Sequence, residues 1–252
     1  MVEDAVRDSG FESTAGGAMQ ESTIRMRESS LRRLSAGAGI AFVVLVVASI
    51  ALTVAAPMPD KSAAKIVKWY ADHRALVFSA NAVGGLGAIA FLWFIGYLHH
   101  MTSLRGGASR ALSSIMFAGG ISTVIMATVS GLPAAALAVG AGRSSAVLSD
   151  GVVHELADLD GFGKVLIGLG LTVLLAALGM MIGGGAVGPR WASPVAYLGS
   201  ALNVIGSVAG FYVSRSGKPD PAGFLGLIGT VLFFIIVLAI SIDLLSRSSA
   251  AD

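Results

Sequence analysis

One short segment of the chain concentrates residues that could ligate a metal ion. Positions 149–164 carry three aspartates, one glutamate and one histidine. Imidazole nitrogen and carboxylate oxygen are suitable ligands for divalent cations. The candidate metal ligands are His154, Glu155, Asp158 and Asp160, of which His154 and Asp158 would share one face of a helix. The second histidine of a zinc-peptidase HExxH motif is absent, so the alternative interpretation is a solvated acidic loop.

The other polar motifs do not predict catalysis or a cofactor. Haem ligation by two imidazoles needs histidines that face each other within the bundle, whereas all four histidines of this chain fall at the predicted ends of apolar segments. The chain has no cysteine, which excludes thiolate metal sites and cysteine nucleophiles. Neither a phosphate-binding loop nor a nucleophile elbow is found in a usable context. We therefore predict no cofactor and no enzymatic activity.

The composition indicates a membrane protein. Hydrophobic residues make up 55% of the 252 positions and charged residues 13%, and the mean hydropathy is +0.80. A soluble domain carries charge on about a quarter of its positions. Six uncharged runs each supply the ~20 residues with which a helix crosses a bilayer. We predict an all-α polytopic transmembrane helical bundle within residues 34–247, with spans at 36–56, 75–98, 111–132, 165–187, 192–213 and 221–245.

The segments outside these spans are predicted to be two tails and one surface helix. Residues 1–33 are rich in polar residues and glycine and read as a disordered cytoplasmic tail, and residues 248–252 form a second tail. Ala63, Ile66, Val67 and Tyr70 recur at helical spacing, which predicts a short extracytoplasmic amphipathic helix in the membrane interface. Its interfacial residues are Lys61, Lys65, Lys68, Trp69, Tyr70 and His73. Because its lysines and the acidic segment carry opposite charges, we predict that the two pair weakly and form a lid over the bundle.

Small and polar residues within the spans suggest how the helices associate. Gly206 and Gly210 form a GxxxG pattern, and Gly223 and Gly226 follow in the last span. Glycines at such spacing allow close approach of two helices, either inside the bundle, which we favour, or at a dimer face. Asp243 and Arg247 are spaced to pair along one helix. The polar residues Asn81 and Asn203 are predicted to form hydrogen bonds between helices.

Positive charge gives the orientation. Lysine and arginine are nearly balanced between the two sides, but four arginines, Arg25, Arg27, Arg32 and Arg33, precede the first span. Because the first helix usually dominates orientation, we predict a multi-pass protein of the cell membrane with both termini in the cytoplasm. The basic residues form no stripe with interleaved aromatics, so we predict no nucleic-acid partner. The expected partners are the lipid bilayer and another membrane protein.

Several short motifs resemble uncharacterised actinobacterial multi-pass membrane proteins of the domain-of-unknown-function type. These are the run 69–74 (WYADHR) before a glycine-rich second span, the run 188–191 (GPRW) before the fifth, and the polar carboxyl-terminal tail. The resemblance implies a six-helix bundle with no assigned activity. Because the spans are nearly free of ionisable groups, our leading hypothesis is a non-enzymatic membrane subunit or scaffold. The alternatives are a permease for a small or lipophilic substrate and a metal-dependent membrane enzyme.

Overall fold

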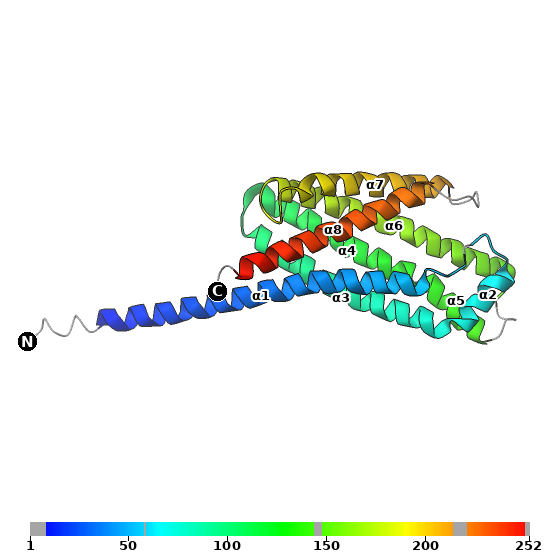
Figure 1. Cartoon of the computed structure of the whole chain (residues 1–252), viewed down its shortest axis with the longest axis horizontal. Helices are drawn as coiled ribbons and strands as arrows, with labels where there is room; N and C mark the ends of the chain where they lie inside the picture. Colours follow the sequence, from blue (N-terminus) through cyan, green and yellow to red (C-terminus); the bar gives the residue numbers. More distant parts are fainter. Residues whose placement is uncertain (1–8, 58, 144–147, 214–220, 250–252) are drawn as a thin grey trace, which may run out of the picture.

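The computed structural model describes residues 9–57, 59–143, 148–213 and 221–249, and these residues are helical without any strand. The helices are α1 (Ser9–Thr53), α2 (Ala63–Asp72), α3 (Arg74–Ser103), α4 (Gly107–Ser130), α5 (Leu132–Arg143), α6 (Asp150–Gly183), α7 (Ala192–Val213) and α8 (Pro221–Ser249). Figure 1 shows the long helices side by side in one bundle, from which the first part of α1 projects. The prediction of an all-α helical bundle is confirmed.

Six helical segments of the described chain are long and apolar enough to cross a membrane, as predicted. They are Glu28–Thr53, Arg74–Ser103, Gly107–Gly142, Asp150–Gly183, Ala192–Gly210 and Phe224–Arg247. The shortest has 19 residues, which at a rise of about 1.5 Å per residue extends about 28 Å, close to the thickness of a hydrocarbon core. The chain is therefore a multi-pass membrane protein.

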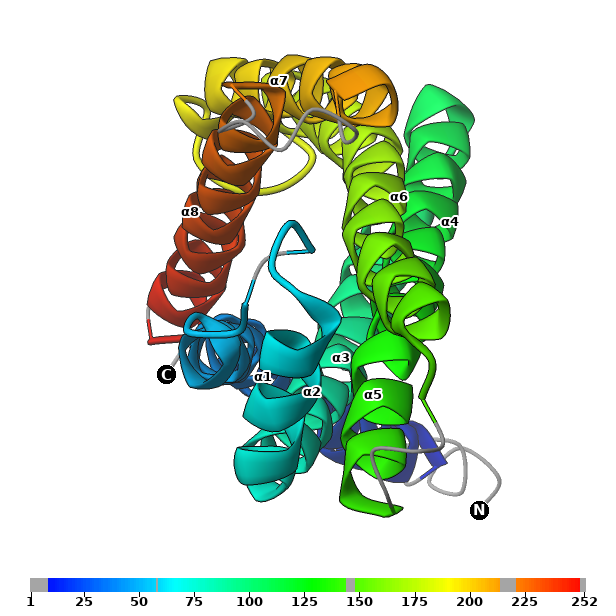
Figure 2. The ribbon, with the colours of Figure 1, turned by 90° about the vertical axis from the view of Figure 1, so that its right-hand side faces the viewer.

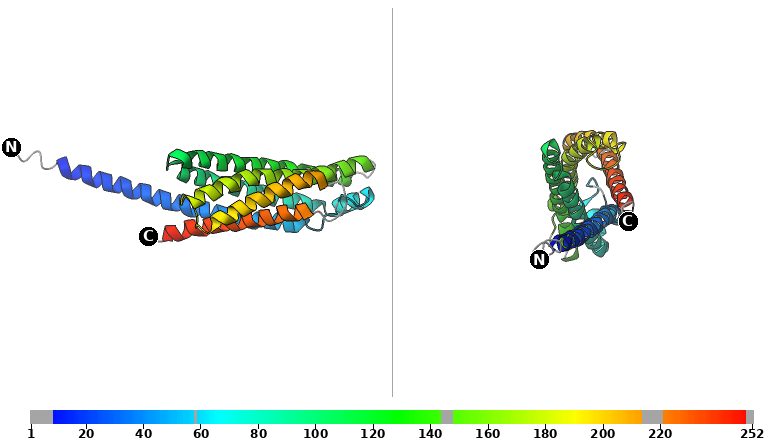
Figure 3. Two further views of the ribbon diagram at one scale, coloured as in Figure 1. Left: turned by 90° about the horizontal axis from the view of Figure 1, so that it is seen from above. Right: turned by 90° about the vertical axis from the view of Figure 1, so that its left-hand side faces the viewer.

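The six spanning helices form a ring that follows their order in the sequence. Contacts join α1 to α3, α3 to α4, α4 to α6, α6 to α7 and α7 to α8, and α8 returns to α1. Figures 2 and 3 show this ring from its two ends. Short connections place helices that follow one another in the sequence side by side. The contact between α1 and α8 joins helices that are far apart in the sequence and closes the ring.

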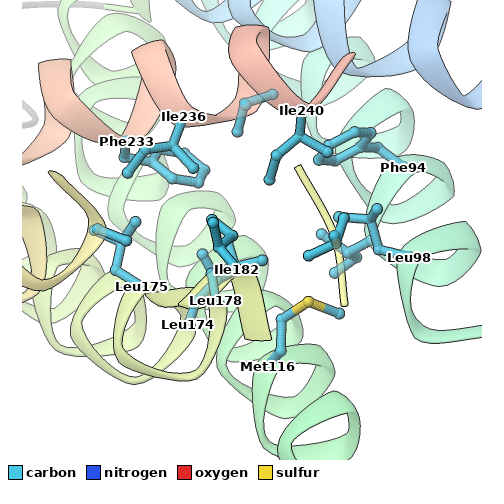
Figure 4. Close-up of a cluster of buried hydrophobic side chains, with 14 of the residues drawn as sticks. Phe94, Leu98, Met116, Leu174, Leu175, Leu178, Ile182, Phe233, Ile236 and Ile240 are labelled. Carbon is cyan, nitrogen blue, oxygen red and sulfur yellow. The ribbon is translucent and has the colours of Figure 1, made fainter. Parts of the chain in front are cut away.

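Apolar side chains fill the interior of the half of the ring that lies away from α2 and α5. The rings of Phe42 on α1 and Phe91 on α3 have centroids 4.5 Å apart, and Phe233 of α8 lies 5.6 Å from Phe91. Met116 of α4 and Leu174 of α6 extend the same cluster and are fully buried (Figure 4). Lipid tails are as apolar as these side chains, so close van der Waals packing, rather than exclusion from water, stabilises the cluster.

The amino-terminal segment differs from the prediction. We expected a disordered tail over residues 1–33, but α1 is helical from Ser9, and residues 1–8 lie outside the described part. Forming the first turn of a helix is the unfavourable step, and each further residue adds one hydrogen bond. Because the first span is already helical, the helix can extend from it towards the amino terminus. An ion pair of 3.7 Å between Glu28 and Arg32 also lies along this part of α1.

The acidic segment differs as well. We placed the start of the fourth span at 165 and considered a loop before it, but α6 begins at Asp150 and the acidic residues form its first turns. Ser149 precedes the helix, and its side-chain oxygen accepts a hydrogen bond from the backbone N–H of Val152 at 3.5 Å. A serine at this position followed by an aspartate in the first turn favours a helix start.

The third span is interrupted near the predicted place. Helix α4 ends at Ser130, and after Gly131 the chain continues as α5 with Pro133 near its start. Proline lacks a backbone N–H, so it cannot continue the hydrogen bonding of the preceding helix but fits the first turn of the next one. The prediction ended this span at 132. The residues that follow, which are mostly small, are helical as α5.

Candidate ligand cleft at the capped end

One end of the ring is covered by protein. Helix α2 packs there against α5 and the first turns of α6, and Figure 2 looks at this end with α2 and α5 in front. The contact is a second apolar cluster, made of Ala63, Ile66, Tyr70, Val77, Leu137, Ala138, Val153 and Ala157. We call this region the capped end.

The predicted amphipathic helix is present, but its apolar face has a different partner. We expected this face to lie in the membrane interface, whereas Ile66 is fully buried and Tyr70 is nearly so, against protein. Burial, and secondarily the charge of Asp160, raises the pKa of the Tyr70 phenol to about 12. An apolar face is stabilised equally by lipid and by protein, so the helical periodicity did not distinguish the two.

The contact between α2 and α6 is apolar, which corrects the predicted electrostatic lid. The two segments do lie together at the capped end, but Lys65 and Lys68 form no ion pair within the described part of the chain. The carboxylate of Asp160 instead pairs with Lys164 of its own helix at 2.6 Å. Apolar burial therefore holds α2 in place, and its lysines remain available for a ligand.

A hydrogen bond fixes the connection between α1 and α2. The Nδ1 atom of His154 lies 3.2 Å from the backbone oxygen of Pro59. Since a carbonyl oxygen can only accept, Nδ1 carries the proton. The bond ties the first turns of α6 to a loop 95 residues away in sequence.

A cleft of about 330 Å³ lies between this loop and the polar face of α2. Its lining residues are Ala55, Pro57, Lys61, Lys65, Lys68, Trp69, Asp72 and His73. The three lysine side chains are exposed, and Lys61 contacts Asp60 at 2.9 Å. All six residues that we predicted as interfacial belong to α2 or to its flanks, and five of them line this cleft, while Tyr70 faces the core instead.

Two stacked rings form part of the cleft. The rings of Trp69 and His73 have centroids 4.7 Å apart and are tilted by only 12°. The Nδ1 atom of His73 donates a hydrogen bond of 2.9 Å to the backbone oxygen of Trp69. This bond fixes the imidazole orientation and leaves Nε2 as the ring atom that can contact a ligand.

The predicted metal ligands do not come together as a metal site. Among the residues that the structure describes, no group of three or more His, Asp or Glu side chains is close enough to hold a metal ion. His154 is bonded to the loop and Asp160 to Lys164, while Glu155 and Asp158 are exposed. Because α6 is helical here, the four side chains point in several directions around its axis. In a flexible loop the same residues could have turned towards one ion.

Three of the predicted packing glycines lie next to a neighbouring helix. A Cβ atom added at Gly210 would meet the Val165 side chain of α6 at 2.9 Å, and one added at Gly226 would lie 3.9 Å from the Cα of Gly206. Gly206 and Gly226 thus bring α7 and α8 together inside the bundle. The surroundings of Gly223 lie outside the described residues.

Closer glycine contacts, which the sequence analysis missed, join α4 to α6. A Cβ atom at Gly170 would lie 2.9 Å from the backbone nitrogen of Thr123, and one at Gly119 would lie 2.8 Å from that of Leu174. These glycines do not share the GxxxG spacing on one helix, so no local pattern marked them.

The polar residues within the spans are mostly bonded within their own helices. The amide Nδ2 of Asn203 donates to the backbone oxygen of Gly199 at 2.9 Å, and that of Asn81 donates to Val77 at 3.1 Å. The predicted hydrogen bonds between helices are therefore not formed by these amides. The predicted pair of Asp243 with Arg247 is confirmed, with a distance of 3.0 Å.

A polar network at the opposite end of α3 was also missed. The Ser113 hydroxyl of α4 lies 2.8 Å from Nδ1 of His99 and 2.8 Å from the hydroxyl of Thr102. His99 also stacks on Phe117, with centroids 4.9 Å apart. The network joins α3 to α4 and contains no acidic residue. We therefore interpret it as a contact that holds the two helices together.

Comparison with protein-family models, curated proteins and solved structures finds no match to this chain. The resemblance to actinobacterial membrane proteins therefore stays a prediction.

Proposed function

We propose that this multi-pass membrane protein is a non-enzymatic subunit or scaffold of a membrane assembly, in the cell membrane with both termini in the cytoplasm. The observation that carries the proposal is the apolar packing inside the ring. Aromatic and aliphatic side chains from α1, α3, α4, α6 and α8 meet there. The buried polar residues of the described chain are serine, threonine and asparagine, and no Asp, Glu, Lys, Arg or His is among them. A bundle of this kind suits stable contact with a partner better than passage of a polar solute.

A permease would need a path through the ring, and in the half away from α2 and α5 apolar side chains occupy the interior. Substrate sites of transporters typically lie near the bilayer midplane, between helices that are broken there. Among the described residues one span is broken, at Gly131, beside the capped end, where Leu137 and Ala138 of α5 are buried in the second cluster. This break is the observation that favours the permease as the second candidate, because it could let α4 and α5 move.

Water access to the ring interior distinguishes the two functions. The chain has no cysteine, so single cysteines at Met116 and Ala177, both buried in the interior, can be labelled without background. We expect a hydrophilic maleimide to leave both positions unmodified in membranes and to modify them after denaturation, because close packing excludes water. Mass spectrometry of the intact protein measures the modified fraction.

Ser62→Cys, which lies at an exposed position before α2, is the matched positive control. Two variants are used so that a folding defect in one of them does not decide the result. Rapid labelling at both 116 and 177 in well-folded protein would contradict a closed scaffold and support the permease.

A further inference from the structure

We propose that the cleft between the end of α1 and the polar face of α2 binds a phosphate group, carried by a lipid headgroup or present as free phosphate. The proposal goes beyond the function proposed above and does not depend on it. The cleft combines three lysines, a fixed pair of stacked rings and a position at the membrane boundary.

Helical spacing directs the three lysines to the same side. Lys65 and Lys68 lie within α2, and Lys61 directly precedes its capping residue, Ser62, so all three line the cleft. Each ammonium group offers three donors and a compact positive charge, which suits a phosphate oxygen.

The polar face is held rigidly by contacts on the other side of α2. Ala63, Ile66 and Tyr70 are buried against α5 and α6, and the bond from His154 to Pro59 fixes the loop that forms the opposite wall. Such a site is largely formed before the ligand arrives, so binding does not have to order the loop. At about 330 Å³ the cleft lies at the lower end of the range for small-ligand pockets, which fits a headgroup-sized ligand.

One carboxylate limits where the phosphate can lie. Asp72 is the only acidic residue among those that line the cleft, and it follows Lys68 by one helical turn. Lys61 is already paired with Asp60 at 2.9 Å, so Lys65 and Lys68 are the lysines left to bind the phosphate, on the amino-terminal side of Asp72. Removal of this charge should therefore strengthen binding rather than weaken it.

The location explains how a lipid phosphate would reach the cleft. The first span ends at Thr53, and Ala55 and Pro57 of the cleft follow directly after it. Trp69, a residue type that favours the interface between membrane and water, lies in the same wall. The lysines are therefore positioned at the depth of lipid headgroups.

Fluorescence of Trp69 can report binding by the full chain in neutral detergent. The other two tryptophans, Trp93 and Trp191, are about half exposed outside the core and can be replaced by phenylalanine. The probes are short-chain phosphatidylglycerol, inorganic phosphate, and dioctanoylglycerol, which has no phosphate. We expect saturable changes with phosphatidylglycerol or phosphate and none with dioctanoylglycerol.

Single variants test the role of each charge. We expect Lys65→Gln and Lys68→Gln to weaken binding about tenfold each, as loss of a charged hydrogen bond implies, and Asp72→Asn to strengthen it. Lys164→Gln is the matched control, because it removes the same charge from the same end of the bundle, on α6 outside the cleft. We expect it to leave the affinity unchanged.

The outcomes distinguish the sources and the mechanism. Tighter binding of phosphatidylglycerol than of inorganic phosphate identifies a lipid site, and equal affinity identifies a site for the phosphate group itself. Equal loss of affinity in Lys164→Gln would show that general charge attracts the probes, which would overturn the proposal. An unchanged affinity in Lys65→Gln and Lys68→Gln, or an equal response to dioctanoylglycerol, would overturn it too.

Discussion

Two buried serines of the bundle have opposite hydrogen-bonding environments. The hydroxyl of Ser193 on α7 donates to the backbone oxygen of Gly179 on α6 at 2.8 Å. The hydroxyl of Ser241 on α8 is fully buried and has no hydrogen-bond partner within the described residues. A buried polar group without a partner destabilises the folded state, whereas a bonded one contributes to stability.

Replacement of each serine by alanine should therefore change stability in opposite directions. We expect Ser241→Ala to raise the free energy of unfolding by about 1 kcal/mol and Ser193→Ala to lower it by a similar amount. Thermal unfolding of the purified protein in one detergent measures both, and each variant serves as the control for the other. A loss of stability in Ser241→Ala would mean that its hydroxyl binds a water molecule or a protein group.

At the scale of elements, glycine contacts decide how closely the helices approach. The backbone of α6 at Gly170 lies against that of α4 at Thr123, so an added methyl group would meet main-chain atoms. At Gly226 of α8 the nearest atom to an added methyl group is the Cα of Gly206 at 3.9 Å, which is an ordinary contact distance. The α4–α6 interface is thus the one that depends most on the absence of a side chain.

This difference predicts unequal effects of the same substitution. We expect Gly170→Ala to lower stability by about 1–3 kcal/mol, because two backbones would have to separate. Gly226→Ala is the matched control and should be neutral or slightly stabilising, since alanine favours helix more than glycine does. Unfolding temperatures in detergent give the comparison. Equal effects at the two positions would indicate that α4 and α6 can separate without cost.

At the scale of the whole molecule, the even number of spans places the two termini on the same side. Figure 1 shows the start of α1 and the end of α8 on the side of the bundle opposite α2 and α5. Four arginines precede the first span, and we propose that they hold this end in the cytoplasm. The capped end and its cleft then face outward.

Cysteine labelling in intact cells tests this orientation. Ser62 lies at the capped end before α2, and Ser103 ends α3 on the other side. We expect a membrane-impermeant reagent to modify Ser62→Cys in intact cells and to modify Ser103→Cys only after permeabilisation. The reverse pattern would place the termini outside, and the cleft would then meet the inner leaflet.

The sequence by itself determined the membrane class, the six spans, a short amphipathic helix from Ala63 to Tyr70 and the pair of Asp243 with Arg247. Each of these depends on residues close together in the chain. A run of about 20 apolar residues must become a helix in lipid, since its backbone can be satisfied in no other way. A spacing of four residues likewise brings two side chains onto one helix face.

The tertiary structure alone decided which surfaces meet. The apolar face of α2 covers protein instead of lipid, and His154 bonds to the loop after α1 instead of joining a metal site. The closest backbone contacts of the glycines lie between α4 and α6 and not at Gly210. These outcomes depend on closure of the ring, which brings together segments as far apart as Pro59 and His154. An apolar face or a glycine can pack against several partners at similar cost, so only the full set of helix contacts selects one.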